Sequence, residues 1–218
     1  MTPKYTALTD ELHGYLVDHG ARQDDVLRRL QAETEALGDV AVMQIAPDQG
    51  AFLTLMARAI GARSALELGT FTGYSAICIA RGLGDGGRLV TCDLNEQWTE
   101  IARRYFRDAG VAHRIELRLG SALETLRALP ADESFDLAFI DADKEEYLDY
   151  YEEVLARLRA GGLMMVDNVL RGGAVLDADD DSPANATVRA LNERVAADER
   201  VDVAMLGVAD GITLALKR

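Results

Sequence analysis

The sequence has few cysteines and no long apolar run. Cys78 and Cys92 lie in apolar stretches that are typical of a helix and a strand, and neither belongs to a CxxC pair. This argues against a disulfide framework, so we expect two reduced core residues. No continuous apolar segment follows the early charges, so neither a signal peptide nor a membrane helix is visible. We therefore expect a cytoplasmic protein that does not bind membranes.

Basic residues are also scarce. The chain has 37 acidic against 23 basic residues, which gives a formal net charge of −14 at pH 7. Because a large negative net charge repels the phosphate backbone of nucleic acids, nucleic acid is not an expected partner. A length of 218 residues with 49% hydrophobic content suits one large α/β domain. We therefore expect a single domain over residues 1–218.

The first forty residues have helical periodicity. Apolar side chains recur at near-helical spacing, which predicts two amphipathic helices; they are Leu12, Leu16, Val26, Leu27, Leu30 and Leu37. This helical segment, residues 1–60, precedes the main core at residues 61–218. We expect it to cover a site or to pair subunits.

The core alternates short apolar runs with helical stretches. The runs SALEL, RLVTCD, IELRL, FDLAFID and GLMMVD are typical of buried parallel strands. Helices are expected at 73–82, 95–109, 145–159 and 183–197. The final stretch, VDVAMLGVADGITLALKR, has two apolar runs joined by Asp210-Gly211, which predicts an antiparallel hairpin. The prediction is a doubly wound, mostly parallel α/β sheet of about seven strands.

Ligands of such sheets bind beyond the carboxyl ends of the strands. The first of these ends is LELGTFTGYS, in which Gly69 and Gly73 flank a turn. It lacks the GxGxxG pattern of a pyrophosphate cradle, and with Glu67 inside the strand it suits a ligand without phosphates. An ordinary turn is the alternative.

The second and third strand ends favour a nucleoside. Asp93 ends the second strand, where an acidic residue can accept hydrogen bonds from ribose hydroxyls. After the third strand, Ser121 and Ala122 leave room for a flat adenine. For Asp93 and Ser121 alike, the alternative is a helix N-cap.

The fourth and fifth strand ends carry the most specific pattern. FIDADK supplies Asp141, Asp143 and Lys144, and MMVDN supplies Asp167 and Asn168, from strands expected to be neighbours. Such hard oxygen donors suit Mg²⁺ or a similar cation. The three histidines lie away from these strand ends, which leaves a zinc site without support; they are His13, His19 and His113.

Together these segments resemble the cation-dependent O-methyltransferases of the catechol and caffeoyl-coenzyme A type, which have a Rossmann-like methyltransferase fold. The resemblance runs from about Tyr5 to the last residue. It is carried by MQIAPDQGAFL, LELGTFTGYS, the strand-end Asp93, FIDADKEEYLDYY, LRAGGLMMVDNVLRGG and DGITLALK.

The resemblance implies a division of the site. The metal, Mg²⁺ or another divalent cation such as Mn²⁺ or Ca²⁺, would be held by Asp141, Asp167 and Asn168. S-adenosylmethionine would be surrounded by Glu67, Gly69, Thr70, Ser75, Asp93, Ala122 and Asp141. Met43 and Ile45 match the backbone stretch beside its methionine moiety. Family members are commonly dimers, so a homodimer is expected.

Lys144 matches the family's proposed general base. Its position, three residues after a metal ligand, allows it to face the same oxygen, and a nearby divalent cation disfavours the ammonium form. A phenol, whose reference pKa is about 10, becomes more acidic when its oxygen contacts a metal. The expected substrate is a small vicinal dihydroxy aromatic (a catechol). The alternative for Lys144 is a surface lysine that begins a helix.

The chain departs from the family pattern at two positions. Arg171 stands where members commonly have tryptophan, and Gly172 where caffeoyl-type members have asparagine, so a coenzyme A thioester is not specifically indicated. Arg171 either meets an acidic group of the substrate or pairs with the acidic loop at 177–181. Two other functions are weighed: a non-catalytic S-adenosylmethionine-binding protein, and a nicotinamide oxidoreductase. The intact metal set argues against the first, and the missing GxGxxG against the second.

Overall fold

A seven-stranded sheet of order β3-β2-β1-β4-β5-β7-β6 forms the centre of the computed structural model, which describes residues 4–130 and 134–218. Strands β1 to β5 are parallel, and β7 runs antiparallel to both β5 and β6. Their bounds are β1 Ser64–Leu68, β2 Arg88–Asp93, β3 Ile115–Leu119, β4 Phe135–Ile140, β5 Leu158–Asp167, β6 Val201–Leu206 and β7 Ile212–Lys217. The predicted α/β sheet with its C-terminal antiparallel hairpin is confirmed.

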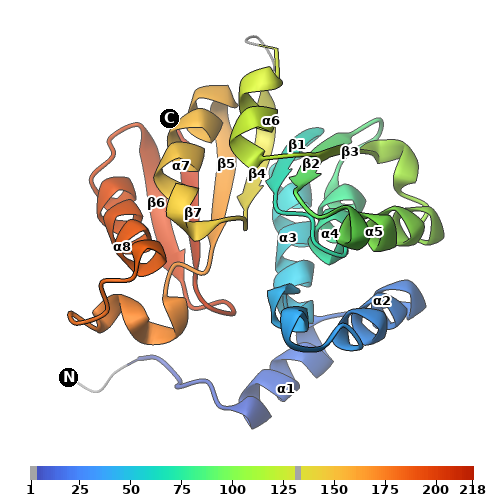
Figure 1. Ribbon diagram of the computed structural model, residues 1–218, viewed down its shortest axis with the longest axis horizontal. Coiled ribbons are helices and arrows are strands. Elements are labelled where there is room, and N and C mark those ends of the chain that lie inside the picture. Colours follow the sequence, from blue (N-terminus) through green and yellow to red (C-terminus); the bar gives the residue numbers. More distant parts are fainter. Residues whose placement is uncertain (1–3, 131–133) are drawn as a thin grey trace.

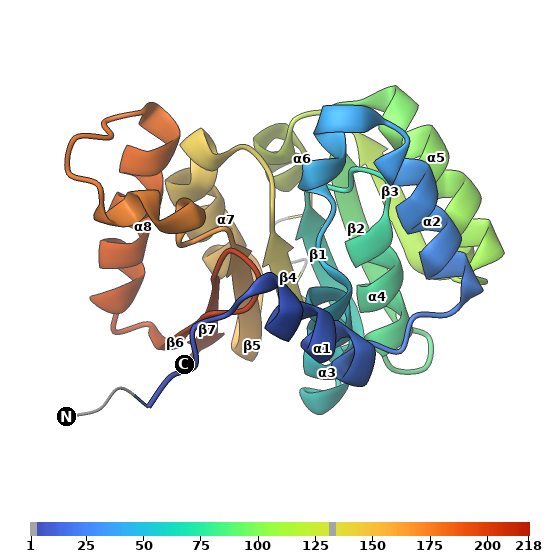
Figure 2. The ribbon, with the colours of Figure 1, turned by 90° about the horizontal axis from the view of Figure 1, so that it is seen from below.

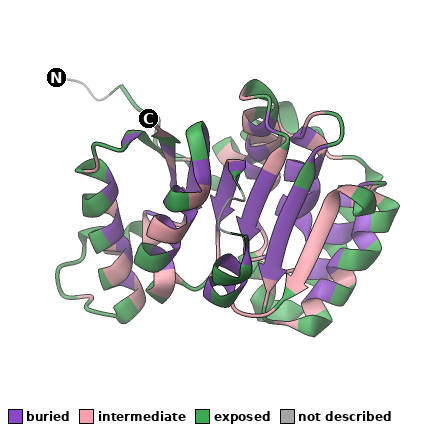
Figure 3. Ribbon diagram, turned by 90° about the horizontal axis from the view of Figure 1, so that it is seen from above, coloured by how far each residue is buried: buried purple, intermediate pink, exposed green. Residues whose placement is uncertain are grey.

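Helices cover both faces of this sheet (Figure 1). One face packs against α3 (Pro47–Ala59), α4 (Tyr74–Gly82) and α5 (Glu96–Asp108), and the other against α6 (Ala122–Ala128), α7 (Tyr147–Arg157) and α8 (Pro183–Ala196). Because side chains alternate along a strand, β4 contributes to both cores. Leu137 and Phe139 join the first, and Ala138 and Ile140 the second. The central strands are therefore buried on both faces, whereas the edge strand β3 is half-buried (Figure 3).

Most expected helices lie within a few residues of their observed bounds. The expected helix at 145–159 is shorter, because a 3-10 turn (η3, Lys144–Glu146) precedes α7 and β5 already begins at Leu158. Helix α3 falls within the helical segment expected at residues 1–60, and α6 follows Ser121, for which a helix N-cap is the alternative. Pro47 begins α3 at a position where proline's missing N–H costs nothing. Ser121 begins α6 by accepting a hydrogen bond from the Glu124 amide, so the N-cap alternative holds for this serine.

The N-terminal segment forms the two expected helices, α1 (Asp10–Gly20) and α2 (Asp25–Glu35), followed by the 3-10 segment η1 (Gly38–Met43). Helix α2 buries Leu27 and Leu30, whereas α1 buries no side chain and lies beside α3 (Figure 2). Its role in pairing subunits stays a prediction. Among the residues described, no helix combines the length and apolarity that crossing a membrane needs.

Both cysteines are buried and free, as expected. Burial raises the pKa of the Cys78 and Cys92 thiols to about 12, so they stay protonated and unreactive near neutral pH.

Candidate active site

A cavity of about 850 Å³ lies at the edge of the sheet where the parallel strands end. Residues at or just beyond the ends of five strands line it, among them Gly69, Asp93, Ser121, Asp141 and Asn168. The carboxyl ends of parallel strands share one edge, which is why positions far apart in the sequence converge here. The strand-end rule thus located the cavity.

The loop after β1 requires glycine at its first position. Gly69 has φ +94°, and a Cβ built there would lie 2.0 Å from the carbonyl oxygen of Asp141. The adjacent Leu68 carbonyl accepts a hydrogen bond of 2.9 Å from the Asp141 amide. The loops after β1 and β4 are therefore in contact through backbone alone, and any side chain at Gly69 would separate them.

Asp93 braces this loop. One carboxylate oxygen accepts the amides of Thr70 (3.1 Å) and Phe71 (2.7 Å), and the other accepts the amide of Asn95 (2.8 Å). Helix α5 is capped by Asn95, whose side chain accepts the amides of Gln97 and Trp98, so the N-cap alternative for Asp93 is wrong. Asp93 also lines the cavity, where it remains able to meet a ligand.

Glu67 lies beneath the loop rather than on the cavity wall. It is completely buried; its Oε2 accepts a hydrogen bond of 2.6 Å from the Thr91 hydroxyl. Oε1 has no hydrogen-bond partner within the described part of the chain. Burial raises the pKa of Glu67 to about 8, so the carboxyl group is mostly protonated near neutral pH. Glu67 does not line the cavity, so its contact with a bound ligand stays a prediction.

The three predicted metal ligands come together at the ends of β4 and β5. Asp167 is 3% exposed, and its carboxylate accepts the Asn168 amide at 2.8 Å. Asp141 and Asp167 line the same cavity, and burial together with the neighbouring carboxylate of Asp141 raises the pKa of Asp167 to about 7. Asn168 has φ +54°, a left-handed conformation that asparagine tolerates.

This donor set fits a hard divalent cation, because a positive ion would relieve the repulsion between the carboxylates and asparagine adds a neutral oxygen. Among the residues described, no group of three or more His, Cys, Asp or Glu side chains could hold a metal ion. A cation bound here would therefore need the side-chain amide oxygen of Asn168 as well as the two carboxylates, which stays a prediction.

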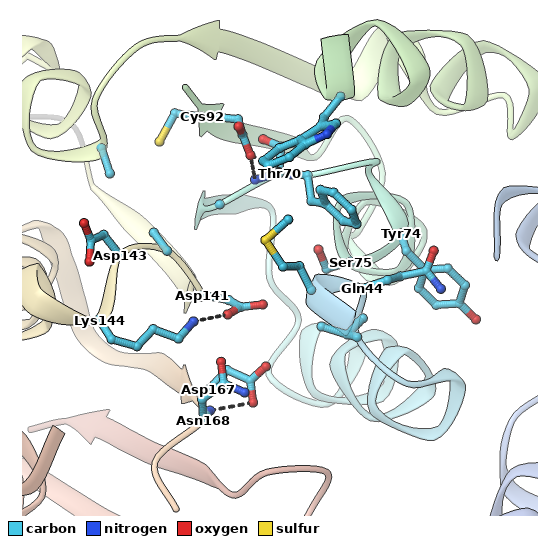
Figure 4. Close-up of a pocket in the computed structure, with 18 of the residues that line it drawn as sticks. Gln44, Thr70, Tyr74, Ser75, Cys92, Asp141, Asp143, Lys144, Asp167 and Asn168 are labelled. Carbon is cyan, nitrogen blue, oxygen red and sulfur yellow. Dashed lines mark hydrogen bonds and ion pairs between the residues drawn. The ribbon is translucent and has the colours of Figure 1, made fainter. Parts of the chain in front are cut away.

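Lys144 reaches the same cluster. Its Nζ donates a hydrogen bond of 2.7 Å to Asp141 (Figure 4). The same Nζ lies 5.3 Å from the centre of the Tyr147 ring. The side chain is only 18% exposed, so Lys144 is not a free surface lysine. Asp141 directly follows β4 and Lys144 begins the 3-10 turn η3, so the short loop between them brings the two side chains together.

The structure thus gathers nearly all of the predicted site residues around one cavity. Those that line it are Met43, Ile45, Gly69, Thr70, Ser75, Asp93, Ala122, Asp141, Lys144, Asp167 and Asn168. Glu67 is the exception and lies behind the wall. Their individual roles stay predictions.

Sequence reasoning missed an aromatic pair in the cavity wall. Phe71 and Trp98 meet edge to face, with ring centres 5.0 Å apart. Phe71 has φ +47°, an uncommon conformation for a bulky residue, which the two hydrogen bonds around Asp93 hold in place. No motif signals this contact, because it depends on that unusual backbone angle.

The sheet order with an antiparallel β7, together with a strand-end cavity, places the chain in the α/β methyltransferase class. A model of the O-methyltransferase family matches residues 17–218. The chain is 37% identical over 207 residues to the probable caffeoyl-CoA O-methyltransferase 1 of Dictyostelium discoideum, covering 93% of this chain and 90% of that protein. The chain therefore belongs to the O-methyltransferase family and is caffeoyl-CoA O-methyltransferase-like.

Other comparisons agree. Caffeoyl-CoA O-methyltransferase 2 of Zea mays is 37% identical over 219 residues, covering 94% of this chain and 82% of that protein. The O-methyltransferase of Bacillus cereus in complex with SAH has a TM-score of 0.88 at 35% identity, with 95% and 97% coverage of the two chains. The O-methyltransferase TomG of Streptomyces achromogenes in complex with SAM has a TM-score of 0.87 at 35% identity, with 95% and 96% coverage. Family membership removes the nicotinamide oxidoreductase alternative.

Proposed function

We propose that this O-methyltransferase transfers the methyl group of S-adenosylmethionine to one hydroxyl of a vicinal dihydroxy aromatic, with a divalent cation as cofactor. The observation that carries the proposal is the convergence of Asp141, Asp167, Asn168 and Lys144 at one end of a single cavity. The braced glycine loop forms the other end. Relatives solved with SAH and SAM support the choice of donor.

The loop after β1 would hold the donor. Backbone of Gly69 and Thr70 can approach it closely, Asp93 can accept from its ribose, and the unpartnered oxygen of Glu67 lies beneath. The Phe71–Trp98 pair offers an apolar wall on the same side.

The other end would hold the cation through Asp141, Asp167 and Asn168. When bound, it lowers the pKa of a phenol that contacts it. Lys144 then takes the phenolic proton at Nζ. A neutral amine can keep its hydrogen bond to Asp141 through one hydrogen while its lone pair accepts the proton, so this contact holds the base in position. A C–O bond forms to the phenolate oxygen as the S–C bond of the sulfonium breaks.

Turnover of a simple catechol tests the proposal. We expect labelled methyl transfer from S-adenosylmethionine with Mg²⁺ or Mn²⁺, loss of transfer in excess EDTA, and recovery when the cation is restored. Phenol, which has a single hydroxyl, is the matched control and should be a far poorer acceptor. Full activity in excess EDTA, or equal use of phenol and catechol, would contradict the metal-assisted reaction.

A further inference from the structure

The cavity wall is strongly acidic and carries one cation without a partner. Its acidic residues, among those described, are Asp93, Asp141, Asp143, Glu146, Asp167 and Asp210, and its cations are Lys144 and Arg171. Lys144 pairs with Asp141. Arg171 makes no hydrogen bond or ion pair within the described chain, and its Nε is buried without a partner. A buried donor in this state is costly unless a ligand meets it.

The acidic loop at 177–181 does not supply that partner. Arg189 binds it instead, donating to the carbonyls of Asp177 (2.8 Å) and Asp180 (2.6 Å). Hydrogen bonds from Ser182, with smaller effects of Arg189 and Arg171, lower the pKa of Asp180. The effect of Arg171 on the loop is therefore only a long-range electrostatic one. The pairing of Arg171 with the acidic loop is not found among the described residues.

The backbone holds Arg171 in place. It has φ +53°, a left-handed conformation that costs a residue with a side chain about 1–2 kcal/mol. Its neighbours are fixed by Asp210 in the β6–β7 turn: the Leu170 amide donates to the Asp210 carbonyl (3.0 Å), and the Gly172 amide to the carboxylate (2.6 Å). Such strain persists where the surroundings enforce it, which is common at ligand sites.

Arg171 lies at the end of the cavity that carries the predicted metal ligands, where the methyl acceptor would bind (the acceptor end). It follows β5 by four residues and the predicted ligand Asn168 by three. The loop after β1, which would hold the donor, is two strands away, roughly 10 Å at the usual strand spacing. An acceptor bound beside the predicted metal ligands would therefore lie closer to Arg171 than the sugar of the donor does.

From these observations we infer that Arg171 selects aromatic acceptors that carry a carboxylate as well as the two hydroxyls. A guanidinium matches a carboxylate through two parallel N–H···O bonds. The inference rests on the proposed function, because it assumes that the acceptor binds beside Asp141, Asp167 and Asn168. S-adenosylmethionine also carries a carboxylate. The test must therefore distinguish binding of Arg171 to the acceptor from binding to the donor.

The test compares protocatechuate with its methyl ester under saturating S-adenosylmethionine and Mg²⁺. The two differ in charge, and the ester has the more acidic phenol, so preference for the acid reports binding. We expect the wild-type protein to favour the acid in kcat/KM by about tenfold or more. This is the effect expected from one pair of charge-assisted hydrogen bonds between a guanidinium and a carboxylate. Arg171→Gln should remove this preference through the KM of the acid, and Arg171→Lys should restore part of it. Arg189→Gln, the matched control in the loop, should leave the preference intact.

Each other outcome overturns the inference in a distinguishable way. Equal use of acid and ester by the wild-type protein, or an equal loss for both in Arg171→Gln, contradicts the inference while the proposed function stands. A weaker dissociation constant for S-adenosylhomocysteine in Arg171→Gln, measured by calorimetry, would assign the guanidinium to the donor. If no catechol of either kind is methylated, the proposed function fails and the inference falls with it. Thermal melting of each variant shows whether it is folded.

Discussion

The two ends of the cavity are built in different ways. Around Gly69 and Asp93, the structure is fixed by backbone: a carbonyl against a glycine, and a carboxylate that accepts three amides. Around Asp167 and Arg171, side chains determine the site, and the buried Nε of Arg171 has no protein partner in the described chain. The proposed donor end is therefore preorganised by backbone, whereas the proposed acceptor end depends on side chains that a ligand could meet. Substitutions at the two ends should accordingly affect different measurements.

The largest effect is expected at the acceptor end. Asp167→Asn keeps the volume of the side chain but removes a charged metal ligand, so turnover should fall by roughly a thousandfold, in line with several kcal/mol from a catalytic metal. Added Mg²⁺ should recover part of it, and the dissociation constant for S-adenosylmethionine should change little. Activity measured against Mg²⁺ concentration, with Asp179→Asn in the exposed loop as control, tests this. If Asp167→Asn reduced the affinity for S-adenosylmethionine as much as it reduced turnover, the assignment of donor and acceptor to different ends of the cavity would be contradicted.

Lys144→Met is expected to reduce kcat by about 10²–10⁴-fold, the usual contribution of general acid–base catalysis, and to leave donor binding unchanged. Raising the pH should recover part of the loss. A nitrocatechol, whose hydroxyl is already acidic, should suffer less than catechol in the same variant. Equal losses for both substrates at every pH would make Lys144 a positioning residue.

At the donor end, Asp93→Ala should weaken binding of S-adenosylmethionine by about tenfold or more and also destabilise the fold by about 1–3 kcal/mol, because three amides lose their acceptor. Calorimetry and urea unfolding measure the two effects. Asn95→Ala is the control, since it removes only the cap of α5 and should cost about 1 kcal/mol of stability. If the variant Asp93→Ala binds S-adenosylmethionine as tightly as the wild-type protein, the role of Asp93 is only to hold the loop after β1 in place.

The smallest effect concerns pH and stability. The pKa of Glu67 is raised from 4.5 to about 8, so the folded protein holds a proton that the unfolded chain releases within this range. Stability should therefore fall as pH rises through this window, by at most about 1.4 kcal/mol per pH unit. Glu67→Gln should flatten the dependence in urea unfolding across the same range. The exposed Glu100→Gln is the control, and a slope unchanged by Glu67→Gln would contradict the protonated state.

Much of this arrangement could be predicted from local sequence. Buried parallel strands appear as short apolar runs, and polar residues directly after them lie at one edge, which located Asp93, Asp141 and Asp167. Bracing by Asp93 was not predictable, because it depends on amides of a loop from another strand. Which arginine pairs with the acidic loop was equally hidden, since Arg171 and Arg189 both suit it and only the fold decides that Arg189 reaches it.

The position of β7 has a consequence for the order in which the protein folds during synthesis. This strand lies between β5 and β6 although it follows both in the chain. Until Ile212–Lys217 has left the ribosome, β5, which carries Asp167, remains an open edge with unpaired backbone groups. Strand β1, which leads into the loop at Gly69, comes early in the chain and pairs with β2 and β4. A nascent chain can therefore complete the proposed donor end first, while the proposed acceptor end becomes competent only after β7 has been synthesised.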